Sequence, residues 1–223
     1  SLLTSSIFRT GSTDSGSEGS KVIFYQDGKT ASISLFQSRN GVLSLQTNGK
    51  TDASIQLDLR KSYVRDQLTQ YLAAALPLAY LPESKQVAII GLGSGLTSHA
   101  MLAHEGIVKV DTIEIESVVA SASRGYGEAV ERVYSDSRSE IHIDDAKTFF
   151  SLHQKVYDII IAEPSNPWVS GVANLFTIEF YETIKRYLPQ DGVFVQWVQL
   201  YEFNDELVIS ILKALSEAFP DYV

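Results

Sequence analysis

Two patterns of apolar and polar positions divide the chain into two parts. Between residues 21 and 50, the short runs VIFY, TASISLF and GVLSLQTNG alternate apolar and polar positions, with Asp27–Gly28 and Asn40–Gly41 between them. Such alternation, interrupted by residues that favour hairpin turns, predicts a small antiparallel sheet. From Gln86 onward, apolar runs alternate with segments of helical spacing, which predicts strands joined by helical crossovers in a mostly parallel sheet.

The second part is expected to alternate strands and helices. We expect strands at 87–90, 108–115, 140–143, 157–162 and 192–199, and helices at 97–105, 117–124, 145–153, 175–188 and 205–218. Asn204 is the expected N-cap of the last helix. An earlier helix is expected at 62–80, with one apolar face made of Val64, Leu68, Tyr71, Leu72 and Ala75. The expected fold class is α/β, with helices on both faces of the sheet.

Composition sets the expected domain boundaries. Residues 1–20 are rich in Ser, Thr and Gly and are expected to form a flexible arm. Residues 21–58 are expected to form an N-terminal β domain, and residues 59–223 the larger α/β domain. The chain opens without Met and ends at Asp221–Val223 as if a strand were beginning, so we expect an excised or C-terminally truncated piece of a longer protein.

Charge and composition exclude several classes of function. The net charge of −9 argues against binding to a nucleic-acid backbone, which requires clustered Lys and Arg. An acidic surface suits a cationic substrate, although it also serves solubility alone. The absence of Cys excludes thiol catalysis, disulfides and Cys-based zinc sites. His99 and His104 are not at the i, i+4 spacing of ligands on one helical face, so we expect no metal site.

No apolar segment is long enough to cross a bilayer, because the most apolar stretch, Tyr71–Leu81, is short and interrupted by Pro77. No basic start is followed by an apolar run, so no signal peptide is expected. These features predict a cytoplasmic location, either as a free protein or as the soluble domain of a membrane-anchored one.

A glycine-rich loop, residues 91–95 (GLGSG), follows the first strand of the parallel part and precedes a helix. Glycines at this place permit a tight turn and let a ligand approach the backbone. Glu114 lies near the end of the next strand, where an acid commonly receives ribose hydroxyls. The alternative interpretation is a Gly-rich turn with an exposed Glu.

Two acids, Asp144 and Asp145, end the third parallel strand at the same edge of the sheet. We expect Asp144 to cap the following helix and Asp145 to accept a hydrogen bond from an exocyclic amine such as that of adenine; alternatively, one or both only cap. The loop lacks the GxGxxG spacing of a dinucleotide site, and no GK[ST] P-loop occurs. A phosphate-free adenosyl ligand therefore fits best.

The segment Tyr157–Tyr181 places an acid at the end of a buried strand. Its apolar run stops at Glu163, and a loop containing Trp168 follows. Because ligands of open α/β sheets bind beyond the carboxyl ends of the strands, Glu163 is a candidate catalytic residue. The alternative is an ordinary turn with a solvated Glu.

The motifs GLGSG, IEIE, HIDDAKTF, YDIIIAEPSNP, LFTIEFY and GVFVQW occur in this order along the chain. Over Val22–Phe219 the sequence resembles the spermidine synthase, or polyamine aminopropyltransferase, family, and most of all the spermidine synthase-like domains that are fused to membrane segments. The resemblance implies a Rossmann-like class I methyltransferase fold with a small N-terminal β domain. It also implies transfer of an aminopropyl group from decarboxylated S-adenosylmethionine, a co-substrate, to a small-molecule amine, with no prosthetic group.

The resemblance implies a role for each motif residue. The residues that would hold the donor are Gly91, Gly93, Ser94, Gly95, Glu114, Asp145 and Ala146. Glu163 would be catalytic, and the amine would meet Asn166, Trp168 and Gln196. Trp168 would cover the cation with its ring face or only pack the loop.

Several positions differ from the family pattern. Ser94 replaces an Asp that binds the donor's terminal amine, and Asn166 replaces an Asp that holds the acceptor amine. The DE…YHE signature is absent, with Thr51–Ala53 as its nearest remnant, and the segment that closes the polyamine site is absent or lies beyond Val223. Because Ser94 neither attracts an ammonium nor repels a carboxylate, S-adenosylmethionine itself stays a candidate donor.

The chemistry sets a requirement on Glu163. An attacking amine must be neutral, yet a Lys-like amine has a pKa near ~10.4 against about 4.3 for Glu, which makes the proton transfer uphill by about 8 kcal/mol in water. Burial must therefore raise the pKa of Glu163 and lower that of the amine.

Three function hypotheses follow. The preferred one is a spermidine synthase-like aminopropyltransferase; the others are an S-adenosylmethionine-dependent methyltransferase and a non-enzymatic domain that senses an adenosyl ligand or a polyamine. The resemblance also implies a homodimer or homotetramer, and the fused relatives imply a membrane segment in the flanks.

Overall fold

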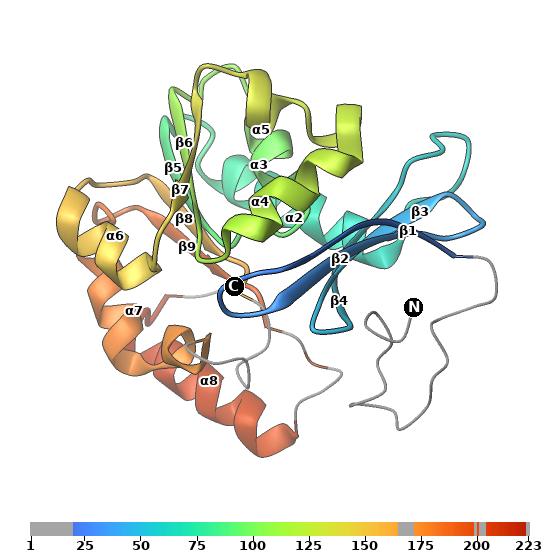
Figure 1. Ribbon diagram of the computed structural model, residues 1–223. Helices are drawn as coiled ribbons and strands as arrows, with labels where there is room; N and C mark the ends of the chain where they lie inside the picture. The colour runs from blue at the N-terminus through green and yellow to red at the C-terminus, as the bar shows by residue number, and fades with distance from the viewer. Residues whose placement is uncertain (1–19, 165–171, 199, 201–203, 222–223) are drawn as a thin grey trace.

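The computed structural model describes residues 20–164, 172–198, 200 and 204–221 (Figure 1). Two sheets organise these residues: a four-stranded sheet of order β1-β2-β3-β4 and a five-stranded sheet of order β7-β6-β5-β8-β9. In Figure 1 the blue N-terminal sheet lies beside the body that contains the larger sheet. The predicted combination of a small antiparallel sheet with an α/β part is confirmed.

The small sheet is an antiparallel meander. Its strands are β1 (Lys21–Asp27), β2 (Ser32–Gln37), β3 (Val42–Thr47) and β4 (Lys50–Gln56). Strand β4 is not predicted by the sequence, because the run GVLSLQTNG contains a further turn at its end. Asn48 and Gly49 have φ of 51° and 77°, the pair of left-handed residues that a tight hairpin requires.

Helix α2 (Arg65–Tyr80) turns an unexpected face inward. The predicted apolar face is wrong, since Leu68 and Leu72 are 46% and 52% exposed. The buried residues are Gln67, Ala74 and Pro77. Gln67 is buried because its side-chain oxygen accepts the N–H of Gln56 at the end of β4 (3.1 Å). A hydrogen bond to the small sheet, together with small side chains, therefore sets the orientation of α2.

The larger sheet is parallel throughout. Its strands are β5 (Gln86–Ile90), β6 (Lys109–Glu114), β7 (Ser139–Ile143), β8 (Ile159–Ala162) and β9 (Val193–Gln196). β5 lies between β6 and β8. The chain adds β6 and β7 on one side of β5 and then β8 and β9 on the other, so the order of strand addition reverses beside β5. In such sheets, ligands usually bind beyond the carboxyl ends of the strands at this reversal, which lies here between β5 and β8.

Helices follow the predicted order. They are α3 (Leu96–Met101), α4 (Ser117–Ser123), α6 (Ala146–His153), α7 (Ile178–Lys185) and α8 (Asp205–Ala218). Asn204 caps α8 as predicted, accepting the N–H of Leu207 at 2.9 Å. The short elements η2 (Arg124–Val130), α5 (Arg132–Ser135) and η3 (Val172–Phe176) are not predicted. Within the described parts of the chain, no helix is long and apolar enough to cross a membrane.

Helices cover both faces of the parallel sheet, as predicted. Val87 and Ile89 of β5 pack in one buried cluster with residues of α2 and α3, whereas Ala88 and Ile90 pack in another with residues of α6, α7 and α8. Alternate residues of a strand point to opposite faces, so one apolar strand serves both clusters. This double coverage explains why β5 is apolar at nearly every position.

A third buried cluster joins the two sheets. Ile33 and Leu35 of β2 pack with Val119 of α4, Tyr126 of η2 and Leu92 of the Gly-rich loop. The small sheet therefore packs against the Gly-rich loop. The division into domains at 58/59 stays a prediction, and all but the last residue of the predicted arm, 1–20, lies outside the described residues.

Candidate functional site

The Gly-rich loop joins β5 to α3 at the carboxyl end of the parallel sheet. Gly91, Gly93 and Gly95 have φ of 94°, 51° and 89°, which other residues rarely adopt. Gly91 has a second constraint, because a Cβ there would lie 2.6 Å from the backbone carbonyl oxygen of Glu163. The structure thus brings the predicted donor loop directly against the predicted catalytic residue.

Glu114 ends β6 and holds the Gly-rich loop. Its carboxylate accepts the backbone N–H groups of Leu92 and Glu116, each at 2.9 Å. The residue is buried, so the interpretation of Glu114 as an exposed side chain is wrong. Burial raises the pKa of Glu114 despite these hydrogen bonds. Because a carboxylate oxygen has two lone pairs, each can still receive a ribose hydroxyl.

Ser94 is fully buried within the loop. Its hydroxyl donates to the side-chain oxygen of Gln70 in α2 (2.5 Å) and accepts the N–H of Leu96 (3.2 Å). These bonds tie the start of α3 to α2. In the family pattern this position carries an acid. Here the Ser94 side chain forms hydrogen bonds within the protein instead.

Glu163 directly follows β8. Its N–H donates to the carbonyl oxygen of Ile90 at 2.9 Å, and Thr97 of α3 donates to its Oε1 at 3.0 Å. Burial raises the pKa of Glu163 to about 7; the Thr97 hydrogen bond opposes this rise and the negative charge of Asp66 adds to it. A carboxyl with this pKa is suited to accept a proton near neutral pH.

Two further carboxyl groups lie close to this site, Asp52 of β4 and Asp66 in the first turn of α2. Burial raises the pKa of each to about 6. Asp66 accepts the N–H of Ser54, which joins α2 to β4, and its charge also raises the pKa of Asp52. The sequence prediction missed Asp66; its place in the first turn of the helix before the Gly-rich loop was the available signal.

The expected roles of Asp144 and Asp145 in capping are reversed. Asp145 is the N-cap of α6, since its Oδ1 accepts the N–H of Thr148 at 3.0 Å. Asp144 instead accepts the N–H of Asp145 at 2.8 Å. The prediction failed because both acids precede the helix and only the backbone decides which one takes the cap. Contact of Asp145 and the buried Ala146 with an adenine stays a prediction.

Gln196, the predicted residue on the amine side, ends β9 and pairs with the last residue of β8. Its Nε2 donates to the carbonyl oxygen of Trp197 at 3.0 Å, while its buried Oε1 has no hydrogen-bond partner among the described residues. A buried acceptor without a donor is unfavourable, so a ligand N–H would stabilise it. Asn166 and Trp168 lie outside the described residues.

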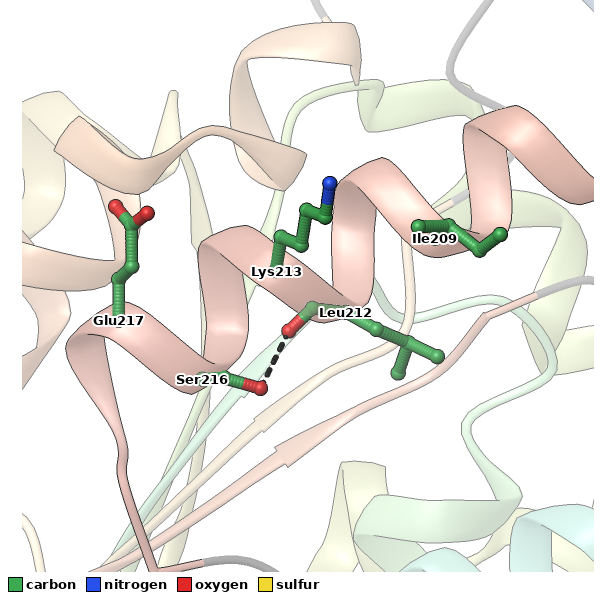
Figure 2. Close-up of a pocket in the computed structure, with 5 residues that line it drawn as sticks. All are labelled: Ile209, Leu212, Lys213, Ser216 and Glu217. Carbon is green, nitrogen blue, oxygen red and sulfur yellow. Dashed lines mark hydrogen bonds between the residues drawn. The ribbon is translucent and has the colours of Figure 1, made fainter.

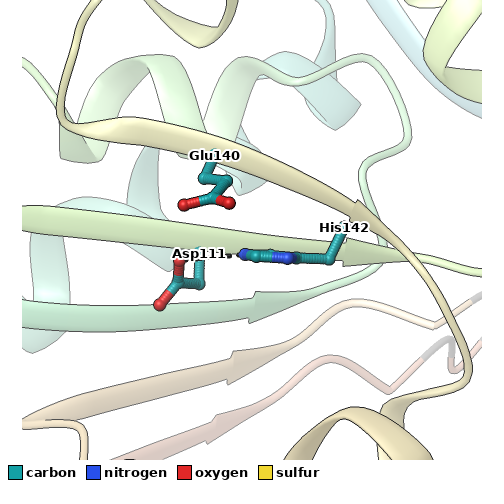
Figure 3. A group of neighbouring side chains, drawn as sticks. All are labelled: Asp111, Glu140 and His142. Carbon is teal, nitrogen blue, oxygen red and sulfur yellow. Dashed lines mark hydrogen bonds and ion pairs between the residues drawn. The ribbon is translucent and has the colours of Figure 1, made fainter. Parts of the chain in front are cut away.

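Away from the Gly-rich loop, Asp111, Glu140 and His142 point toward one another across β6 and β7 (Figure 3). Asp111 pairs with His142 at 3.0 Å and with Lys155 at 2.7 Å, and Glu140 pairs with Lys109 at 2.5 Å. Lys155 and Lys109 neutralise Asp111 and Glu140. We therefore assign the group to ion pairing between neighbouring strands.

A surface pocket lies along α8 (Figure 2). The residues that line it are Ile209, Leu212, Lys213, Ser216 and Glu217. None of them belongs to the predicted site, which lies beside the Gly-rich loop.

Comparison of the sequence with known proteins shows the family of this chain. The sequence profile of the Spermine/spermidine synthase domain matches residues 67–223. The chain belongs to the spermine/spermidine synthase family.

Curated members of the spermine/spermidine synthase family are similar to this chain over part of their length. The polyamine aminopropyltransferase of Caldicellulosiruptor saccharolyticus is 32% identical over 149 residues, covering 67% of this chain and 53% of that protein. That of Moorella thermoacetica is 31% identical over 158 residues, covering 70% of this chain and 56% of that protein. The chain thus spans about half the length of these relatives.

Spermidine synthase structures share the fold of this family member. The Thermotoga maritima enzyme matches with a TM-score of 0.77 at 24% identity, covering 90% of this chain and 65% of that chain. A spermidine synthase in complex with the transition-state analogue AdoDATO matches with a TM-score of 0.78 at 24% identity, covering 90% and 66%. The predicted Rossmann-like, class I methyltransferase fold with a small N-terminal β part is confirmed.

Proposed function

We propose that this chain transfers an aminopropyl group from decarboxylated S-adenosylmethionine to a polyamine-type amine. The observation that carries the proposal is the contact between the Gly-rich loop and Glu163, which sets a carboxyl with a pKa of about 7 beside the expected donor position. Membership of the spermine/spermidine synthase family supports the same reaction. So do the curated relatives, which are named polyamine aminopropyltransferases.

Glu163 is the proposed proton acceptor. The bound ammonium first gives a proton to Glu163 and becomes a neutral amine. The nitrogen lone pair then forms the new N–C bond while the C–S bond breaks, and the electron pair of the C–S bond leaves with sulfur as the neutral thioether of methylthioadenosine. The alkylated product leaves as an ammonium. Because the pKa of Glu163 is about 7, the difference between it and the pKa of a Lys-like amine falls to about 3 units, which corresponds to about 4 kcal/mol for the proton transfer. Desolvation lowers the pKa of the bound amine and so reduces this difference further.

The charge of the site suits two cationic substrates. Asp66 raises the pKa of both Asp52 and Glu163, and Asp52 raises that of Glu114, so these acids repel one another through the site. A sulfonium donor and a polyamine both bring positive charge and would relieve this repulsion. The Oε1 of Gln196, which has no hydrogen-bond partner in the described part of the chain, offers an acceptor for an amine N–H.

Binding of the donor is assigned to the loop and the two strand ends beside it. In this proposal the glycines line the adenosyl donor, Glu114 receives the ribose, and Asp145 with Ala146 meets the adenine. The Ser94 hydroxyl is committed to Gln70 and Leu96, so the loop presents no charge to the donor's terminal group. Asn166 and Trp168 complete the amine side of the proposal.

The test is incubation with decarboxylated S-adenosylmethionine and a panel of diamines, followed by chromatography. We expect release of methylthioadenosine that requires an amine and falls by at least about 100-fold in Glu163→Gln. The control Glu179→Gln alters an exposed acid in the first turn of α7 and should retain the wild-type rate. Absence of methylthioadenosine, while a known synthase forms it, would reject the proposal.

The same experiment separates the alternatives. Formation of S-adenosylhomocysteine from S-adenosylmethionine would establish a methyltransferase. Ligand binding without turnover, unchanged by Glu163→Gln in calorimetry, would establish a sensing domain. The oligomeric state, the membrane segment in the flanks and the cytoplasmic location stay predictions, and light scattering of the purified chain tests the first.

A further inference from the structure

One buried hydroxyl connects the parts of the candidate site. Thr97, in the first turn of α3, is 2% exposed. Its Oγ1 lies 3.0 Å from Oε1 of Glu163 and 3.3 Å from the backbone carbonyl oxygen of Gln70 in α2. A hydroxyl has a single hydrogen to donate but can also accept. Its hydrogen can therefore point to only one of these two acceptors at a time.

We propose that Thr97 is a positioning residue that holds the Glu163 side chain in both of its protonation states. The inference rests on the proposed role of Glu163 as proton acceptor. When Glu163 is ionised, the Thr97 hydroxyl donates to Oε1. When Glu163 has taken the amine proton, its new O–H donates to Oγ1 of Thr97, and the Thr97 hydrogen turns to the carbonyl oxygen of Gln70. The two side chains stay hydrogen-bonded throughout.

The surroundings keep the carboxyl within reach of this hydroxyl. The N–H of Glu163 is bonded to Ile90, and the absence of a side chain at Gly91 lets its carbonyl lie against the loop. The backbone of Glu163 is thereby fixed on one side and Thr97 is fixed in α3 on the other. The hydrogen bond therefore joins two groups whose backbones are held in place, so only the hydrogens change position when Glu163 gains or loses its proton.

Asp66, from α2, acts in the opposite direction to Thr97, because its charge raises the pKa of Glu163. The charge of Asp66 also raises the pKa of Asp52 in β4, and that of Asp52 raises the pKa of Glu114 in β6. Among the described residues, Thr97 is the group whose interaction lowers this pKa. Removal of the hydroxyl should therefore leave Glu163 protonated to higher pH and less able to accept a proton.

The test compares Thr97→Val, which is nearly isosteric, with Thr97→Ser, which keeps the hydroxyl. The titration of Glu163 is followed by carbon-13 NMR of Glu-labelled protein, with Glu163→Gln to assign the signal. We expect Thr97→Val to raise the midpoint by about one pH unit and to lower kcat about tenfold on the acid side of the profile, with the donor KM within about twofold. Thr97→Ser should restore both.

The matched control is Thr112→Val. Thr112 is also buried, and its hydroxyl bonds to Ser98 rather than to Glu163, so this variant should leave the Glu163 midpoint unchanged. A midpoint in Thr97→Val equal to that of the wild type would overturn the proposal. If Thr97→Val does not fold, Thr97→Ala gives the same comparison with a smaller side chain.

This readout is independent of the proposed function. A wild-type chain that releases no methylthioadenosine would reject aminopropyl transfer, while the titration would still report whether Thr97 controls Glu163. Conversely, an active chain whose Glu163 midpoint is indifferent to Thr97 would keep the function and reject the positioning role.

Discussion

Gly91 and Glu163 lie in contact where the neighbouring strands β5 and β8 end, so close that a Cβ on Gly91 would be 2.6 Å from the Glu163 carbonyl oxygen. The pairing of these strands continues to this point, since the N–H of Glu163 donates to Ile90 at 2.9 Å. Sheet pairing itself therefore joins the loop to the acid, and a side chain at position 91 would separate them.

We expect Gly91→Ala to lower the free energy of unfolding by about 3 kcal/mol, because the methyl group meets a backbone atom and φ of 94° is strained for Ala. Gly93→Ala is the comparison in the same loop. Its φ is 51° and its nearest neighbour would be Ala53 Cβ at 3.7 Å, so it should cost about 1 kcal/mol. Urea unfolding measures both; equal losses would show that the contact with Glu163 does not matter.

We expect Glu163→Gln to stabilise the chain at alkaline pH. The wild-type carboxyl binds its proton more tightly when folded, with a pKa of about 7, than when unfolded. Its contribution to stability is therefore complete below the unfolded value, near ~4.3, and is lost as pH rises through 7. The variant should exceed the wild type by up to about 3 kcal/mol at pH 8 and by little at pH 4.

Thermal unfolding between these two pH values measures the difference. The variant keeps an amide oxygen that can accept from Thr97, so the comparison isolates the charge. Glu179→Gln, at an exposed site, should follow the wild type at every pH. A stability difference at position 163 that does not change with pH would contradict the raised pKa.

Asp111→Asn should have the opposite pH dependence. Burial alone would raise the pKa of Asp111, but hydrogen bonds from Lys155, His142 and Tyr157 hold it below its usual value. Its contribution is therefore present above the unfolded value and lost as pH falls through the folded one. We expect the variant to lose about 2–4 kcal/mol at pH 7, with the loss shrinking below about pH 4.

Urea unfolding across this range tests the prediction. The control Asp58→Asn breaks a surface ion pair with Arg60, whose N–O distance is 2.8 Å, and should change stability little. If both variants lost the same small amount, the network around Asp111 would contribute no more than a surface ion pair.

The orientation of α2 predicts that a polar substitution at the exposed Leu72 lowers stability less than truncation of the buried Gln67. Leu72 is 52% exposed, so Leu72→Gln should change stability by less than about 0.5 kcal/mol. Gln67 is 3% exposed and accepts the N–H of Gln56, so Gln67→Ala should cost about 1–3 kcal/mol. Chemical denaturation of the two variants gives the order directly, and the reverse order would place the other face of α2 inward.

Much of the fold could be predicted from the chain alone, because strand and helix periodicity and turn chemistry are local properties. The alternating runs of the small sheet and the apolar runs at 87–90 and 159–162 specify strands whatever they pack against. The positions of Glu114 and Glu163 at strand ends followed from the same pattern, since the carboxyl ends of parallel strands meet at one edge.

Other features depend on contacts that no local pattern contains. Strand β4 was missed because the run GVLSLQTNG hides the Asn48–Gly49 turn, and the face of α2 was wrong because Gln67 bonds to Gln56 across the chain. Periodicity counts apolar residues, so it cannot anticipate a buried face held by an amide. The cap of α6 depends in the same way on the backbone conformation of Asp145 rather than on its residue type.

The sequence by itself determined which groups reach the edge of the sheet: the glycines of the loop, Glu114 and Glu163. Only the tertiary structure decided their states. Glu163 has a raised pKa because folding buries it beside Asp66, and it is held by Thr97, which is 66 residues away in the chain. Burial and long-range hydrogen bonds exist only once distant segments pack together, whereas side-chain spacing is present in the unfolded chain.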